Sequence, residues 1–281
     1  MSLARSWVRR PWRLAAELTA LLVAAVVAFP LYWMLLSAFK PAGEIESTEP
    51  RPWTSSPSLD SFRRVFEQEA FGRYFVNSLL VAVSVVVASA LIAFLAATAV
   101  TRFRFRFRTT LLIMFLVAQM VPVEALTIPM FFLMRDFGLL NTLGSLILPH
   151  IAFSLPFAIL MLRGFVKAVP KSLEEAAYLD GASRARFLWQ ILLPLVLPGL
   201  VATSVFSFIS AWNDFLFAKS FIISDTSQST LPMALLVFYK PDEPDWGGVM
   251  AASTVMTIPV LLFFVLVQRR LVSGLGGAVK D

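Results

Sequence analysis

Few side chains in this sequence are of the types that carry out covalent or metal chemistry. The chain of 281 residues has no cysteine and one histidine, His150, which excludes thiolate catalysis and metal sites built from cysteines or clustered histidines. It also lacks the Gly-x-x-x-x-Gly-Lys-Ser/Thr sequence that cradles nucleotide phosphates. No nucleophile can be paired with a base, so we expect neither an enzyme nor a metal site, and we expect His150 to be structural.

A few polar residues interrupt long apolar stretches and are candidates for a path that a polar substrate could follow. Glu124 stands out, because a carboxylate inside a membrane is costly and is usually functional. The alternative is a kink at this point that lets Glu124 reach water or cap a broken helix. Asn77, Ser78 and Gln119 either line a polar path or form hydrogen bonds between helices.

The polar segment 170–194 has the signals of two short helices joined by a bend. Ser172 and Glu175 have the spacing of a capping box, so we predict that the first helix begins there. Gly181 supplies the left-handed residue that ends it, and Ser183 can cap a second helix that runs into the next apolar stretch. One face of the first helix consists of Leu173, Ala176, Ala177 and Asp180.

Two interpretations of this segment stay open on the residues alone. A well-capped connection would account for the cap and the glycine. It would not account for an ordered, amphipathic segment of this length, where about two to eight residues suffice. Small residues on the first helix would let the backbone of another protein approach closely, which favours a docking surface for a partner.

The elements that must position these residues are long apolar stretches. Hydrophobic residues make up 58% of the chain and charged residues 15%, whereas a soluble domain has about a quarter charged residues. About 20 apolar residues cross the hydrocarbon core of a bilayer. Six stretches reach this length, at about residues 14–38, 74–99, 110–134, 144–164, 195–218 and 249–270. We therefore predict an all-α polytopic membrane protein with six transmembrane helices, the first too long to be a signal peptide.

Basic residues concentrate on one side of these spans. Sixteen of the 24 lysines and arginines lie in the N-terminal segment, at 100–109, at 163–194 or in the C-terminal segment, and eight lie in the other connections. By the positive-inside rule, both termini are cytoplasmic. The net charge of +6 then reflects membrane orientation and not nucleic-acid binding. We interpret the alternating arginines and phenylalanines of 102–108 as membrane anchors, with arginines at lipid headgroups.

The segment 170–194 also carries the sequence pattern of a known family. It reads Glu175–Ala177, three residues, Gly181, nine residues, Ile191, one residue and Leu193–Pro194. This matches the EAA signature of the permease subunits of bacterial ABC importers at every fixed position and in both spacings. In that family the corresponding loop forms a coupling helix that sits in a cleft of the ATPase subunit.

The resemblance extends over nearly the whole chain. Residues 211–215 and the tail 268–280 are similar to the carbohydrate branch of the family, in particular to the shorter maltose-type permease. The resemblance implies the type I importer permease fold, with a transmembrane domain over 14–270 between cytoplasmic segments 1–13 and 271–281. It assigns to ATPase coupling the loop at about 165–194, with Leu173, Glu174, Glu175, Ala176, Ala177, Asp180, Gly181, Ile191 and Pro194.

The resemblance also implies a set of partners. These are a second, larger permease subunit, two copies of an ATPase that bind ATP and Mg²⁺, and an extracytoplasmic solute-binding protein. The complex would lie among the lipids of a bacterial inner or plasma membrane, and this chain would hold no cofactor. The tail 273–281 would reach into the interface between the ATPase subunits, unless it is a frayed terminus.

Two further sets of residues are candidates for contacts in a sugar importer. Trp212–Phe215 combine an aromatic face with polar groups, as sugar binding needs, but they also occupy the position of an interfacial anchor. In maltose-type permeases, the outer loop that corresponds to 220–248 reaches into the binding protein. The candidate substrate path is Asn77, Gln119, Glu124, Trp212, Asn213, Asp214 and Phe215, and the candidate binding-protein contacts are Tyr239, Asp242, Glu243 and Trp246.

A secondary transporter or channel that acts without an ATPase is the alternative function. Such proteins often show internal repeats and several buried charges. Here no repeat is visible, and Glu124 is the one candidate for a buried charge. The solute stays open among mono-, di- and oligosaccharides, amino sugars and glycerol phosphates.

Overall fold

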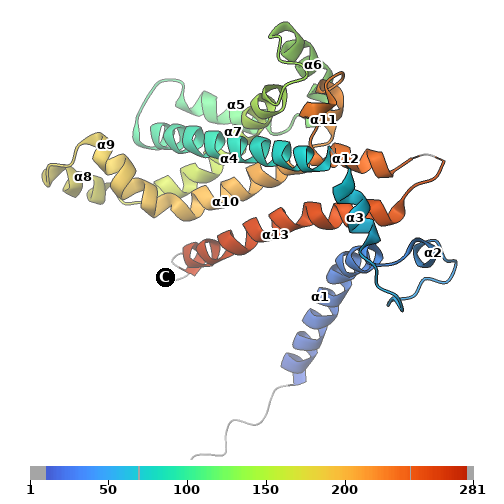
Figure 1. Ribbon diagram of the computed structural model, residues 1–281. Helices are drawn as coiled ribbons and strands as arrows, with labels where there is room; N and C mark the ends of the chain where they lie inside the picture. Colours follow the sequence, from blue (N-terminus) through green and yellow to red (C-terminus); the bar gives the residue numbers. More distant parts are fainter. Residues whose placement is uncertain (1–10, 69, 241, 277–281) are drawn as a thin grey trace, which may run out of the picture. The chain divides into compact units, whose positions relative to one another are not determined.

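The computed structural model describes residues 11–68, 70–240 and 242–276, and within these ranges it contains helices and no strand (Figure 1). The prediction of an all-α protein is confirmed. Of the two predicted terminal segments, residues 1–10 and 277–281 lie outside the described residues, and residues 11–13 and 271–276 are helical. The long helices follow from the long runs of apolar residues, since a helix satisfies all its own backbone hydrogen bonds in a bilayer.

Five helices in the described part of the chain are long and apolar enough to cross a membrane. The crossing helices are α1 (Pro11–Ala38), α4 (Phe71–Arg102), α7 (Gly144–Ala168), α10 (Leu193–Trp212) and α13 (Trp246–Gly276). A sixth span is obtained only if two shorter helices that meet at a sharp bend are counted together.

The expected third span is a broken one. α5 (Arg108–Ala118) and the segment that follows it meet at an angle of 96°, where the sequence predicted one helix over 110–134. The break contains Pro122, which has no N–H to donate and disfavours helix at the residue before it. A short 3₁₀ turn, η1 (Val123–Leu126), leads into α6 (Thr127–Asp136). The kink is therefore present and Glu124 is exposed in this turn, while its place in a substrate path stays a prediction.

The fifth and sixth spans differ from prediction in their ends. The helix expected over 195–218 stops at Trp212 and begins well before residue 195, because α9 (Arg184–Arg186) and a π-helical stretch η2 (Phe187–Leu192) run into α10 without a break. α13 continues past residue 270 to Gly276. Hydropathy locates the apolar part of a helix and does not detect the polar turns that extend it.

The chain forms two compact units, and each has its own core. Among the described residues, the first consists of 11–68 with 237–240 and 242–256, and the second of 70–236 with 257–276. In the second unit α4, α7 and α10 pack together along their lengths (Figure 1). Their buried residues include Phe94, Leu162 and Val196, with small residues of α4 between them.

Besides α5, η1, α6 and residues 257–276 of α13, the second unit contains several short elements. α8 (Lys171–Leu179) and α9 lie at one end of the α4, α7 and α10 bundle (Figure 1). The others are α11 (Leu216–Phe221), the 3₁₀ turn η3 (Thr226–Gln228) and the start of α12 (Leu231–Phe238).

The first unit combines α1 with α2 (Ala42–Ile45), α3 (Asp60–Glu67) and the first part of α13. Its buried residues include Val65 of α3 and Ala251 of α13. Lys40 is also buried, where it donates to the carbonyl of Arg51 at 2.7 Å and lies over the ring of Trp33.

Candidate functional site

The helix α8 begins shortly after α7, two residues earlier than the predicted capping box requires. Pro170 occupies the N-cap position in extended geometry, and Lys171 is the first helical residue. Ser172 is then the second residue of the helix and makes no capping hydrogen bond, so the predicted capping box is wrong. Proline is favoured at the start of a helix because its φ is fixed and it has no N–H that would need a partner.

The predicted bend at Gly181 is confirmed and has the geometry of a Schellman motif. Gly181 adopts φ +79°, a left-handed conformation that favours glycine. Its N–H donates to the carbonyl of Tyr178 at 3.0 Å, and the N–H of Ala182 donates to that of Ala177 at 2.9 Å. Ser183 then caps α9 as expected, because its hydroxyl accepts from the N–H of Arg186 at 3.2 Å.

The two faces of α8 differ in exposure. Ala177 is 8% exposed and packs with the core of the second unit, whereas Glu175, Ala176 and Asp180 are exposed. Leu173 is partly exposed, and the tip residue Leu179 is 88% exposed. The helix therefore presents an apolar tip and small side chains outward. Sequence reasoning missed Leu179, because it lies off the face that the periodicity defines.

A buried ion pair ties α8 to the end of α4. Arg102 Nε lies 3.4 Å from Glu174 Oε2, and the two side chains are 6% and 21% exposed. Arg102 Nη2 also donates to the carbonyl of Val169 at 2.9 Å, and the hydroxyl of Tyr178 donates to Glu174 Oε1 at 3.1 Å. One arginine thus contacts the end of α7 and the first turn of α8.

Arg102 was expected to anchor at lipid headgroups, and its burial shows that this interpretation is wrong for this residue. The phenylalanines that follow it, Phe103 to Phe107, are exposed as an anchor would be. Burial and the hydrogen bond to Glu174 raise the pKa of Tyr178, so this hydroxyl stays a donor at neutral pH. A pocket of about 330 Å³ lies beside the pair, lined also by Arg184 and Phe187.

The bend after α8 leads without interruption into α10. Phe187 is buried and its ring contacts that of Tyr178, with 5.8 Å between centroids. Ile191 lies in the π-helical stretch, and Pro194 lies in the first turn of α10, where proline is tolerated. At Gly199 a Cβ would fall 2.3 Å from the ring of Phe165, so α10 and α7 approach closely. After the bend at Gly181, α8 is thus connected to a spanning helix by continuous helical structure.

The polar residues of α4 form hydrogen bonds between segments. The amide of Asn77 donates to the carbonyls of Ser227 and Ser229 at 2.8 and 2.9 Å. The hydroxyl of Ser78 accepts from the N–H of Leu231 at 2.7 Å. Both side chains hold the segment around η3 against α4. Of the two alternatives for Asn77 and Ser78, they therefore form hydrogen bonds between segments.

Replacing Asn77 with leucine should therefore destabilise the protein. Two carbonyls would lose their donor in a buried place, which costs roughly 1–3 kcal/mol. The measurement is the thermal unfolding midpoint of the subunit in mild detergent. Gln119→Leu is the matched control, since Gln119 is exposed and its bond to the carbonyl of Phe153 is long, at 3.4 Å. Equal midpoints for the two variants would contradict the role given to Asn77.

The residues around Trp212 have local partners as well. Trp212 is 1% exposed and packs in a stack against Phe208 and edge-on against Phe75. Asp214 accepts from the N–H groups of residues 217 and 218, each at 3.1 Å, and so caps α11. Asn213 and Phe215 are exposed.

Of the remaining candidates, His150 lies beside α11, where its ring contacts that of Phe217 edge-on, with 5.4 Å between centroids. His150 is buried in α7, with Nδ1 2.9 Å from the carbonyl of Leu146, in keeping with a structural role. In the first unit, Tyr239, Asp242 and Glu243 are exposed, and the ring of Tyr239 contacts that of Trp246 edge-on, with 5.8 Å between centroids.

Comparison with known proteins agrees with this architecture. Residues 89–276 match the model of the family described as binding-protein-dependent transport system inner membrane component. The chain is 42% identical to the diacetylchitobiose uptake system permease protein DasC of Streptomyces coelicolor, over 98% of this chain and 99% of that one. It is 34% identical to the trehalose transport system permease protein SugB of Mycobacterium tuberculosis, over 92% and 94% of the two chains.

A solved structure shares the fold. One chain of a bacterial ABC transporter involved in the import of the acidic polysaccharide alginate superposes with a TM-score of 0.80, at 21% identity, over 94% of this chain and 99% of that one. The family model matches most of the chain, and one relative is 42% identical along its full length. Together these matches establish the family. The chain belongs to the binding-protein-dependent transport system inner membrane components, the multi-pass permease subunits of ABC importers.

Proposed function

We propose that this chain is one of two permease subunits in an ATP-driven importer of a sugar. The observation that carries the proposal is the exposed helix α8, which ends at the left-handed Gly181 and continues through a second helix into the spanning helix α10. Such a helix can receive the motion of a partner and pass it to the membrane. Its partners would be a larger permease, two ATPase subunits that bind ATP and Mg²⁺, and an extracytoplasmic binding protein.

The names of the relatives narrow the class of solute. Two permeases of Streptomyces coelicolor that resemble this chain, at 42% and 34% identity, are named for diacetylchitobiose uptake. Others are named for trehalose and for sulfoquinovosyl glycerol. These solutes are all disaccharides or glycosides. Diacetylchitobiose is therefore the first solute to test, and trehalose is the second.

The proposed mechanism follows from the contacts of α8. With both termini in the cytoplasm, α8 faces the ATPase subunits. Closure of the ATPase pair around ATP would displace α8, and the bend at Gly181 and the ion pair with Arg102 would carry this displacement to α10 and α4. Movement of these helices would open the path outward while the binding protein releases its sugar.

Purification of the tagged subunit from its native host tests this proposal. We expect a larger permease and an ATPase in roughly two copies to accompany it in mild detergent. In liposomes, the complex with its binding protein should accumulate labelled diacetylchitobiose only when ATP is supplied on the ATPase side. A subunit that purifies alone and moves sugar without ATP would instead establish a secondary transporter. The ATPase-free subunit in the same liposomes is the control.

A further inference from the structure

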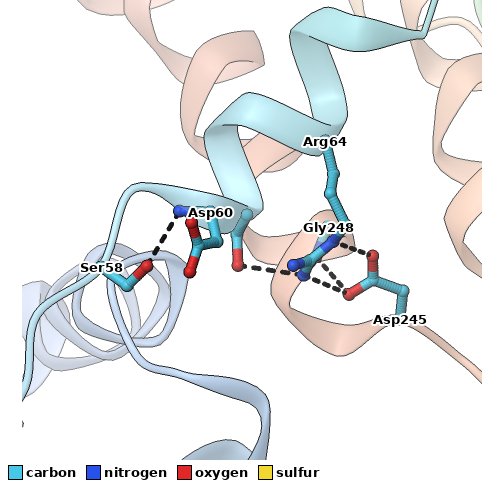
Figure 2. Close-up of polar contacts among 6 residues, drawn as sticks. Ser58, Asp60, Arg64, Asp245 and Gly248 are labelled. Carbon is cyan, nitrogen blue, oxygen red and sulfur yellow. Dashed lines mark hydrogen bonds and ion pairs between the residues drawn. The ribbon is translucent and has the colours of Figure 1, made fainter.

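Two segments far apart in the sequence are joined by a two-pronged ion pair in the first unit. Arg64 of α3 donates from Nε to Asp245 Oδ2 and from Nη2 to Asp245 Oδ1, each at 3.0 Å, across 181 positions of sequence (Figure 2). Arg64 Nη2 also donates to the hydroxyl of Ser61 at 3.3 Å. A planar guanidinium that meets both oxygens of a carboxylate fixes the orientation of the two groups as well as their distance.

Asp245 also fixes the end of the outer loop 239–244. Its Oδ1 accepts from the N–H of Gly248 at 2.9 Å, which caps the first turn of α13. Its own N–H donates to the carbonyl of Phe238 at 2.9 Å, which closes the loop at its base. Burial acts to raise the pKa of Asp245, but the hydrogen bonds from Arg64 and Gly248 outweigh it, and the pKa lies below its usual value. The carboxylate is therefore charged at neutral pH.

The two glycines after Asp245 show that this arrangement is built into the sequence. A Cβ on Gly247 would lie 2.5 Å from the hydroxyl of Ser61 and 3.1 Å from Arg64 Nη2. A Cβ on Gly248 would lie 2.5 Å from the ring of Phe238. A side chain at Gly247 would have to displace the hydroxyl of Ser61, and one at Gly248 would have to displace the ring of Phe238 or the carboxylate of Asp245. The glycines therefore leave room for the arrangement around the ion pair.

The described residues of this loop carry two exposed carboxylates and one exposed lysine, Lys240, and so a net negative charge. Asp242 and Glu243 are exposed beyond the closed base, and Tyr239 lies against Trp246 at its foot. The ion pair thus acts on the base from which the two exposed carboxylates project. A fixed acidic loop suits a protein partner whose docking face is basic.

We propose that Arg64 is a positioning residue, which through Asp245 holds the exposed carboxylates of Asp242 and Glu243 in place for docking of the extracytoplasmic binding protein. This rests on the proposed function, because the binding protein is the partner that such an importer meets on its outer side. Arg64 acts through Asp245 and does not itself contact the partner.

The test uses the assembled importer in nanodiscs with purified binding protein. We expect Arg64→Ala to raise the binding-protein concentration that half-saturates ATPase stimulation by about tenfold, with the maximal rate unchanged. Arg63→Ala is the matched control, since Arg63 is the neighbouring residue on α3, has a 75% exposed side chain and pairs with Glu67 of the same helix. It should change this concentration by less than twofold. Asp245→Asn, which keeps a capping side chain but loses the charge, should behave as Arg64→Ala does.

The absence of cysteine in this chain allows a direct measurement of the loop. Spin labels on Asp60→Cys and Glu243→Cys, with cysteine-free partner subunits, should give a narrow distance distribution that Arg64→Ala broadens. A distance distribution that stays narrow in Arg64→Ala would overturn the proposal. A broadened distribution with an unchanged half-saturating concentration of binding protein would also overturn it. In both cases sugar import itself would stand. A wild-type complex that the binding protein does not stimulate would instead overturn the proposed function.

Discussion

Replacing Gly181 with proline should abolish sugar uptake by the assembled importer while ATP hydrolysis continues. Gly181 has φ +79°, and proline is restricted to about −65°, so the bend between α8 and α9 cannot form with proline in this place. Proline would also remove the N–H that donates to the carbonyl of Tyr178. The helix α8 could still meet an ATPase subunit, but its movement would no longer be passed to α10.

A graded series at this position separates the backbone effect from a loss of folding. Asparagine tolerates the left-handed region and should retain most of the uptake, whereas alanine incurs roughly 1–2 kcal/mol and should be intermediate. We expect the order glycine, asparagine, alanine, proline for uptake per ATP hydrolysed, with equal amounts of assembled complex for all four. The measurements are uptake and ATPase activity in the same liposomes. Normal uptake by the proline variant would exclude the bend from the coupling path.

The features that the sequence predicts correctly are those set by neighbouring residues. A glycine after a short amphipathic helix and a serine two residues later are local signals, and the bend and the cap of α9 are found where they indicate. The long apolar helices are local signals too, because hydropathy over about 20 residues decides whether a segment can cross a bilayer. The predicted capping box is wrong for a local reason as well, because α8 begins after Pro170 and not after Ser172.

The features that the sequence does not predict depend on contacts between distant segments. Nothing near Arg64 indicates that its partner is Asp245, and nothing near Arg102 separates it from the exposed arginines that follow it. Glu174 differs from its neighbour Glu175 only in the direction that the helix gives its side chain. Pairings of this kind are set by how the helices pack, which a single sequence does not record.

Replacing Arg102 with methionine should both destabilise the subunit and reduce coupling. The change would keep the apolar stem but leave Glu174 with only the hydroxyl of Tyr178 as partner, in a place where its side chain is 21% exposed. An unsatisfied, largely buried charge of this kind costs roughly 1–3 kcal/mol. We also expect uptake per ATP to fall about tenfold, because α8 loses its contact with α4. Arg104→Met is the matched control, since Arg104 is an exposed arginine two residues away.

The double variant Arg102→Met and Glu174→Met distinguishes the two effects. Removing both charges leaves no unpaired carboxylate, and similar replacements of buried pairs are often neutral or stabilising. We therefore expect the thermal unfolding midpoint to recover while uptake per ATP stays low, because the methionines do not restore the tie between α4, α7 and α8. If both the unfolding midpoint and the uptake per ATP recovered, the ion pair would serve only to satisfy a buried charge. Recovery of neither would mean that the contact of Arg102 with the carbonyl of Val169 holds this end of the bundle.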